Sequence, residues 1–274
     1  MNAVDNKRKA LMRFNDNVIM TLLGGAVFLG LLVSIGVSSN ASRLFARDDS
    51  QRRFVENRST LDNHNELYHF NSPRDLTLDS AGRIYVADTA NHRIVRMDDM
   101  TGKNWIAFGT LGSGVNQFRS PQGIAVDRHE RIYVTDGNRR IVRIDDMTGR
   151  NWVTLGTAGS GVKQFYNLQG IAVDSFGIIY VADADNNRIV RMDDMTGKNW
   201  TTLGRKDLQS PVPGQFFSPE GLTLDASGRI YVVDHNSPRI MRMDDMSGTH
   251  WTTFNINLNE SSRPYRLVYY HALP

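Results

Sequence analysis

A pattern of about 48 residues recurs four times along the chain, and this repetition constrains the fold more than any other feature. The units open at phenylalanines spaced 48, 47 and 51 residues apart, namely Phe70, Phe118, Phe165 and Phe216. The stretch "RIVRMDDMTGKNW" occupies residues 93–105 and, letter for letter, 188–200, with near-copies at 140–152 and 239–251. Because one such unit cannot bury its own apolar surface, neighbouring units must share a core.

Each unit is predicted to form four short strands. In the second unit these cover residues 120–127, 131–136, 140–145 and 151–156. The runs are rich in β-branched and aromatic residues and are bounded by Gly, Asp, Asn and Ser, which is typical of half-buried antiparallel strands. Four strands in a repeat of about 40 to 50 residues predict a blade of a β-propeller. The expected fold class is therefore all-β, a β-propeller of four recognisable four-stranded blades.

The repeats "GSGVNQFRSPQGIAVDRHERIYVTDGNRRIVRID", "IYVADTANHRIVRMD" and "IYVADADNNRIVRMD" resemble NHL repeats, the blades of NHL β-propellers. The resemblance covers roughly residues 70–251 and implies an interaction platform without a cofactor. Such propellers usually have six blades, whereas residues 42–69 and 252–274 supply one degenerate blade at most, with its best strand at 264–273. Closure at four or five blades, an open arc completed by a second chain, and a truncated chain are the alternatives.

Residues 18–37, "VIMTLLGGAVFLGLLVSIGV", carry no charge over 20 positions, about the length of a helix that crosses a bilayer. We expect one transmembrane helix that acts as a signal anchor; cleavage near residues 39–41 and secretion form the alternative. The expected organisation is a cytoplasmic segment (1–17), the span (18–37), a linker (38–69) and an extracytoplasmic propeller (70–274). Small residues at Ala26, Gly30 and Ser34 share a helix face and suggest a homodimer.

The charge is unevenly distributed, which bears on partners. Residues 1–58 hold nine Lys/Arg against five Asp/Glu, and the remainder holds 23 against 24. A near-neutral body argues against nucleic-acid binding, which needs clustered positive charge. The chain has no cysteine, so disulfides, thiolate metal sites and cysteine nucleophiles are excluded.

Four pairs of adjacent aspartates lie between the third and fourth predicted strands and raise the question of a metal site. A calcium loop spaces its carboxylates at alternate positions, and neighbouring strand residues point to opposite faces, so one pair cannot easily share an ion. Aspartate at the start of a turn accepts backbone N–H groups, and the following glycine supplies a positive φ. We therefore predict turn residues rather than metal ligands at Asp98 and Asp99, Asp145 and Asp146, Asp193 and Asp194, and Asp244 and Asp245.

A second set of charged residues also recurs in every unit. An aspartate ends the second strand and an arginine opens the third, and we expect the two to form a hydrogen-bonded pair in each blade. The pairs are Asp88 with Arg93, Asp136 with Arg140, Asp183 with Arg188, and Asp234 with Arg239.

Other motifs are predicted to be structural. Residues 156–165, "GTAGSGVKQF", are glycine-rich but lack the lysine directly after the last glycine that a phosphate loop requires, so they predict a connection between blades. The tryptophans, one in each unit on the outermost strand, are predicted to pack. The histidines show no metal-binding spacing, and no catalytic set, metal ligand or cofactor site is identified.

A binding site is best sought where the units differ, because identical residues maintain the scaffold. In a propeller, the loops that precede the first strand and those between the second and third strands share one face. We predict that this face binds a protein or another polar ligand. Its candidate residues at the channel mouth are Arg74, Gln122, Gln169 and Glu220, and those in adjacent loops are Asn91, His92, Asn138, Arg139, Asn186, Asn187, His235 and Asn236.

Two departures from the repeat fall near the predicted channel mouth. Asp75 stands where the other units have Gly123, Gly170 and Gly221, and Leu168 replaces the usual proline in the third unit. Either change is expected to alter the channel mouth locally.

The predicted function is that of a recognition or scaffold module. The alternative is an enzyme similar to propeller lyases or lactonases, which a convergent cluster of His, Glu and Asp at the channel mouth favours.

Overall fold

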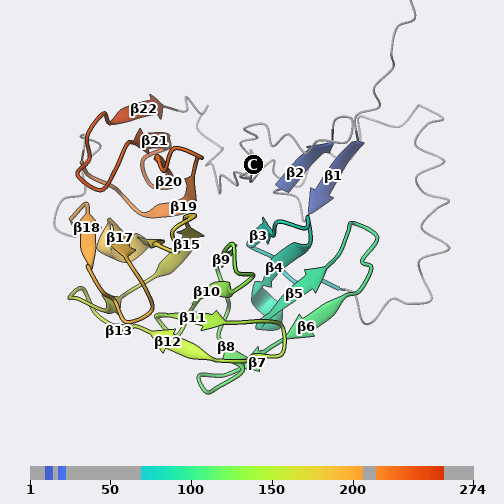
Figure 1. Ribbon diagram of the computed structural model, residues 1–274. Coiled ribbons are helices and arrows are strands. Elements are labelled where there is room, and N and C mark those ends of the chain that lie inside the picture. Colours follow the sequence, from blue (N-terminus) through green and yellow to red (C-terminus); the bar gives the residue numbers. More distant parts are fainter. Residues whose placement is uncertain (1–9, 15–17, 23–68, 206–213, 256–274) are drawn as a thin grey trace, which may run out of the picture.

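A computed structural model describes residues 10–14, 18–22, 69–205 and 214–255 (Figure 1). Its main part contains four antiparallel sheets of four strands, each joined in sequence order. Blade 1 contains β3 (Asp75–Leu78), β4 (Ile84–Asp88), β5 (Arg93–Met97) and β6 (Ile106–Phe108). Blade 2 contains β9 (Ile124–Val126), β10 (Ile132–Asp136), β11 (Arg140–Ile144) and β12 (Val153–Leu155). Blade 3 contains β15 (Leu168–Val173), β16 (Ile179–Asp183), β17 (Arg188–Met192) and β18 (Thr201–Leu203), and blade 4 contains β19 (Pro219–Leu224), β20 (Ile230–Asp234), β21 (Arg239–Met243) and β22 (Thr252–Asn255).

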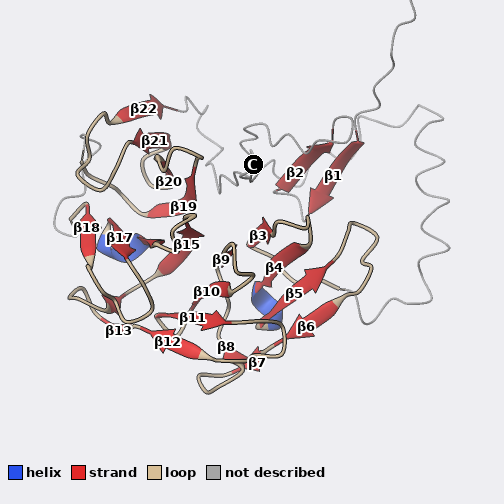
Figure 2. Cartoon of the chain, viewed as in Figure 1, coloured by secondary structure: helices blue, strands red, loops and turns tan. Residues whose placement is uncertain are grey.

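The four blades stand side by side in an arc, with the first strand of each blade on the inside and the fourth on the outside (Figure 1). The described part of the chain is almost entirely strand and loop, with two short 3₁₀ helices, η2 (Thr89–Asn91) and η3 (Ala184–Asn186) (Figure 2). The predicted all-β, four-blade propeller is thus confirmed.

The segments that join the blades contain short strands that the sequence did not predict. Between blades 1 and 2, β7 (Thr110–Leu111) pairs in parallel with β8 (Gln117–Phe118). Between blades 2 and 3, β13 (Thr157–Ala158) pairs in the same way with β14 (Gln164–Phe165). The glycine-rich stretch 156–165 is therefore a connection between blades, as predicted.

The core lies between consecutive blades. Tyr85, Ala87 and Ile94 of blade 1 pack against the next blade, where Phe118 and Ile132 lie in the same apolar cluster. Equivalent clusters join blade 2 to blade 3 and blade 3 to blade 4. Since both faces of an internal sheet are covered, its middle strands are apolar at successive positions rather than strictly alternating.

Each opening phenylalanine packs against the tryptophan of its own unit. The ring centroids of Phe118 and Trp152 lie 5.3 Å apart, and the other three units have the same contact. The predicted packing role of the tryptophans is confirmed, although each precedes the fourth strand by one residue instead of lying on it.

A buried ion pair ties the loops of every blade together, as the sequence predicted. In blade 3, Arg188 Nε lies 2.9 Å from Asp183 Oδ2, and Asp183 is fully buried. Asp183 Oδ1 also accepts the N–H of Tyr166, while Arg188 donates to the carbonyls of Ser160 and Gln164. The pair thus fixes the connection that enters the blade. The same arrangement recurs at Asp88–Arg93, Asp136–Arg140 and Asp234–Arg239.

Part of the predicted membrane segment lies outside the described residues. Residues 18–22 form β2 (Val18–Leu22), which pairs with β1 (Ala10–Phe14). Residues 23–37, the linker up to residue 68 and the expected extra strand at 264–273 are not described. Within the described ranges, no helix is both long and apolar enough to cross a membrane. The transmembrane helix stays a prediction.

Breaking one ion pair is expected to destabilise the protein strongly. Asp183→Asn leaves Arg188 with an uncompensated buried charge, which costs about 3–5 kcal/mol in unfolding free energy. Asp185→Asn, on the exposed side of the same loop, is the matched control and is expected to change stability by less than about 0.5 kcal/mol. Urea unfolding of the full chain at neutral pH measures both, and similar values for the two variants would contradict this role of the pair.

Candidate functional site

The predicted binding face is formed by two sets of loops. We call it the entry face: the segments that lead into the first strands, with the first residues of β15 and β19 (71–74, 119–123, 166–169 and 217–220), and the loops between the second and third strands (89–92, 137–139, 184–187 and 235–238). The turns between first and second strands and between third and fourth strands lie at the opposite ends of the strands and form the turn face.

The four predicted channel-mouth residues occupy equivalent positions at the start of the innermost strands. Arg74 is exposed, Gln122 and Glu220 are half-buried, and Gln169 is buried. The amide Nε2 of Gln122 donates to the carbonyl of Ser120, and that of Gln169 donates to Asn167 Oδ1. The four blades therefore present a guanidinium, two amides and a carboxylate at one structural position.

One acid–base pair forms among the predicted residues. His235 Nδ1 lies 3.5 Å from Glu220 Oε2, and both side chains are largely buried. The neighbouring Asn236 is exposed, and its backbone N–H donates to the carbonyl of Phe217. Blade 4 is thus the blade in which a histidine and a carboxylate converge at the entry face.

A cavity of about 270 Å³ lies between the innermost strands of all four blades. It is lined by residues 75–80, 124–128, 171–176 and 222–228, which include the turns between the first and second strands. The cavity therefore lies toward the turn face. Arg74, Gln122, Gln169 and Glu220 do not line this cavity, because they precede the stretches that do.

Aspartates at the end of the innermost strands, which the sequence prediction missed, organise the cavity rim. Asp79 Oδ1 accepts the N–H groups of Ala81 and Arg83, and its Oδ2 accepts bonds from Arg83 Nε and the Tyr85 hydroxyl. Burial, together with the nearby Asp79 charge, raises the pKa of Tyr85 to about 12. The same set is built around Asp127 and Asp225. The recurrence of this aspartate in every unit is the sequence feature that could have identified the arrangement.

Blade 3 departs from this arrangement. Ile178 stands where the other blades have arginine, so Asp174 keeps only its backbone bonds from Phe176 and Ile178 among the described contacts. Phe176 is 83% exposed at the cavity rim, where the other blades have Ala81, His129 and Ser227.

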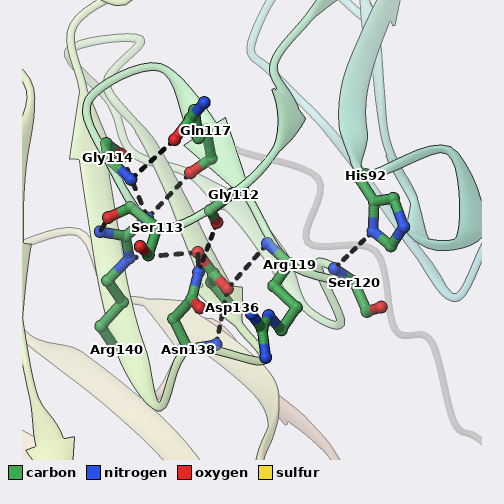
Figure 3. Close-up of polar contacts among 10 residues, drawn as sticks. All are labelled: His92, Gly112, Ser113, Gly114, Gln117, Arg119, Ser120, Asp136, Asn138 and Arg140. Carbon is green, nitrogen blue, oxygen red and sulfur yellow. Dashed lines mark hydrogen bonds and ion pairs between the residues drawn. The ribbon is translucent and has the colours of Figure 1, made fainter.

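Three of the predicted loop residues hold the fold. Asn138 Nδ2 donates to the carbonyl of Gly112 and to Asp136 Oδ2, so it ties the glycine-rich connection to the buried ion pair (Figure 3). Asn186 makes the equivalent bonds to Gly159 and Asp183, and Asn91 bonds Asp88 and the carbonyl of His69. Their amides are occupied by structural bonds, which leaves fewer groups for a ligand.

The next residue in each of these loops adopts a left-handed conformation. His92, Arg139 and Asn187 have φ of 56°, 63° and 50°. His92 Nδ1 accepts the N–H of Ser120 in the following blade (Figure 3), and Asn187 Oδ1 accepts the N–H of Ser218. Two of the three therefore join consecutive blades.

The aspartate pairs are turn residues, as predicted. Asp99 Oδ1 accepts the N–H of Thr101 at 2.8 Å and its hydroxyl at 2.5 Å, while Asp98 Oδ2 accepts Asn104 Nδ2 at 2.6 Å. The hydroxyl and the backbone N–H of Thr101 lower the pKa of Asp99. The two carboxylates of a pair serve different partners. Within the described ranges, no three His, Asp or Glu side chains are grouped to hold a metal ion.

The two departures from the repeat have structural explanations. Asp75 Oδ2 accepts the N–H of Ile124 at 2.8 Å, which joins β3 to the innermost strand of blade 2. At Gly123 a Cβ would collide with the carbonyl of Gln169, so a glycine is needed where the next blade approaches closely. Leu168 is buried and is the first residue of β15, where it pairs with Asp183. Pro219 pairs with Asp234 in the same way at the start of β19, so the leucine does not change the register.

Comparisons with known proteins agree with this fold. The NHL repeat family matches residues 70–97 and 165–192, so the first and third units are NHL repeats. No curated protein sequence matches the chain.

Two solved structures are similar in fold, and a third is similar at a lower TM-score. A catalytically inactive virginiamycin B lyase from Staphylococcus aureus with quinupristin is 22% identical at a TM-score of 0.50, covering 71% of this chain and 59% of the lyase. A Bacteroides thetaiotaomicron protein of unknown function is 18% identical at a TM-score of 0.51, covering 70% and 50%. A nidogen/laminin complex is 20% identical at a TM-score of 0.45, covering 71% and 83%. The chain spans little more than half of the lyase, and identities this low show the fold alone.

The turn role of the aspartate pairs can be tested by titration. Because its pKa is lowered, Asp99 contributes stability above the unfolded carboxyl pKa of about 3.9, and this contribution is lost as the pH falls through its folded pKa. Thr101→Ala is expected to raise the pKa of Asp99 toward the ordinary value and to leave Asp146 unchanged. Carboxyl-carbon NMR titration measures both, and an unmoved Asp99 would show that the hydroxyl does not set its pKa.

Proposed function

We propose that this NHL-repeat propeller is a recognition or scaffold module that binds a protein or another polar ligand on its entry face. The observation that supports it most directly is the contrast between two classes of position. Residues shared by the units, such as Asp183 and Arg188, use their polar groups in hydrogen bonds and ion pairs that stabilise the fold. One equivalent position holds three residue types, one basic, two amide and one acidic, which suits an asymmetric partner: Arg74, Gln122, Gln169 and Glu220.

We also propose that the propeller is held at a membrane through residues 18–37 and lies on the extracytoplasmic side. The support is the uncharged 20-residue stretch and the short segment that precedes it, which makes a cytoplasmic N-terminus the default; basic residues flank the stretch on both sides and do not decide the orientation. Secretion after cleavage is the alternative, and a homodimer through the small residues of this segment is part of the same proposal.

A pull-down with the full chain as bait tests the recognition function. Replacing Arg74, Gln122, Gln169 and Glu220 together by Ala is expected to remove specific capture from an extracytoplasmic fraction. The control carries the same number of changes on the turn face, with Ala at Thr101, Thr148, Thr196 and Ser247. If the entry-face variant captures the same proteins as the unchanged chain, the proposed site is wrong.

The second candidate function is an enzyme, and the pair formed by His235 and Glu220 favours it. A histidine held by a carboxylate can serve as a general base or acid, because the carboxylate orients the imidazole and stabilises its charged form. The described residues offer no third ionisable group for a metal at this pair. Similarity to a lyase fold supports the candidate only as an analogy.

Incubation of the full chain with quinupristin, followed by mass spectrometry, tests this candidate. Conversion of quinupristin that disappears in His235→Ala and Glu220→Gln, but persists in His129→Ala on the turn face, would support catalysis at the pair. Conversion that survives both changes would rule the pair out.

A further inference from the structure

One residue on the entry face of blade 2 breaks the pattern of its neighbours. At the left-handed position before the third strand, His92 in blade 1 and Asn187 in blade 3 use a side-chain acceptor to bind the next blade. Blade 2 has Arg139 there, with φ of 63°. A guanidinium has no acceptor, so it cannot make this bond. Blade 2 therefore keeps a backbone conformation that is unfavourable for arginine. It lacks the side-chain hydrogen bond to the next blade that His92 and Asn187 make from the same conformation.

The Arg139 side chain turns instead toward an exposed aromatic ring. Its guanidinium carbon lies 5.4 Å from the centre of the Tyr166 ring, at a distance typical of a cation–π contact. Tyr166 directly follows the buried Phe165 and is itself 43% exposed. The aromatic ring holds the arginine in place at the junction of blades 2 and 3 without neutralising its charge.

A second arginine lies on the segment next to the one that carries Arg139. Arg119 occupies in blade 2 the position that Tyr166 occupies in blade 3, and it is exposed. The backbone N–H groups of Arg119 and Asn138 both donate to Asp136 Oδ1, at 3.1 and 2.8 Å (Figure 3). The segments that carry Arg119 and Arg139 are therefore fixed side by side by the buried aspartate.

Neither arginine forms an ion pair with a carboxylate in the described part of the chain, whereas Arg140 and Arg143 in β11 both do. An exposed guanidinium that lies over a tyrosine ring, with a second exposed arginine on the adjacent segment, is a combination of residue types that is enriched at protein interfaces. Guanidinium groups bind carboxylates through two parallel hydrogen bonds.

We propose that Arg119, Arg139 and Tyr166 form a docking site for an acidic segment of a partner protein. This inference rests on the proposed recognition function and names the chemistry of the partner. An acidic protein is favoured over a nucleic acid because the chain after residue 58 is near-neutral, with 23 Lys/Arg against 24 Asp/Glu. Phosphate-backbone binding depends on a larger field of positive charge.

The test measures binding of a fluorescent peptide of six glutamates to the full chain by anisotropy. Arg139→Asn is the informative variant, because it removes the charge and installs the residue that joins blades 3 and 4. It is expected to weaken binding about tenfold or more, the effect of losing a charge-assisted hydrogen bond, without lowering Tm. Arg119→Gln is expected to weaken binding similarly. Arg128→Gln, an exposed arginine of the same blade on the turn face, is the control and is expected to have no effect.

Three results would overturn the inference. The first is unchanged binding in both Arg139→Asn and Arg119→Gln, and the second is an equal loss in Arg128→Gln. The third is competition by a short oligothymidine at lower concentration than the peptide, which would indicate a phosphate site. If the peptide fails to bind while the pull-down still captures proteins through the entry face, this docking site is wrong and the recognition function stands.

Discussion

The buried pair of aspartate and arginine is the interaction on which the rest of each blade depends. A carboxylate with no exposed surface is tolerated because it receives a backbone N–H from the incoming segment and a guanidinium from its own third strand. The same arginine binds carbonyls of the glycine-rich connection. One pair thus sets the start of the blade, the hairpin between its middle strands and the link to the previous blade.

This arrangement explains why one face of the propeller is free to vary. The backbone of the entry face is held by hydrogen bonds from the buried pair and from the side-chain amides of residues such as Asn138 and Asn186. His92 and Asn187 at adjacent positions still join consecutive blades, but the side chain at this position differs from blade to blade, as Arg139 shows. On the turn face, by contrast, the aspartate turns satisfy their own hydrogen bonds and recur almost unchanged.

The sequence predicted the parts of the molecule that repetition makes visible. The four blades, the ion pairs, the aspartate turns and the packing of the tryptophans follow from residues that recur at fixed spacing. The individual roles of loop residues did not follow, because they depend on contacts between units. Asn138 and Arg139 are adjacent, yet the Asn138 amide binds the carbonyl of Gly112, whereas the Arg139 guanidinium lies over the exposed Tyr166 ring.

The cavity was missed for a related reason. Its position depends on how the innermost strands of four blades are placed relative to one another, which no single repeat encodes. Asp79 and its equivalents recur at that end of the strands in every unit, but recurrence alone does not indicate a cavity. Phe176 was the strongest individual signal, since the other units carry small or polar residues at its position.

The central claim is that shared residues build the scaffold and that the entry face alone recognises a partner. Hydrogen–deuterium exchange of the full chain, with and without the glutamate peptide, tests it directly. The account predicts slower exchange confined to residues 119–122, 137–139 and 166–169, with residues 98–104 and the equivalent turns unchanged. Slower exchange in the aspartate turns, with none on the entry face, would contradict it.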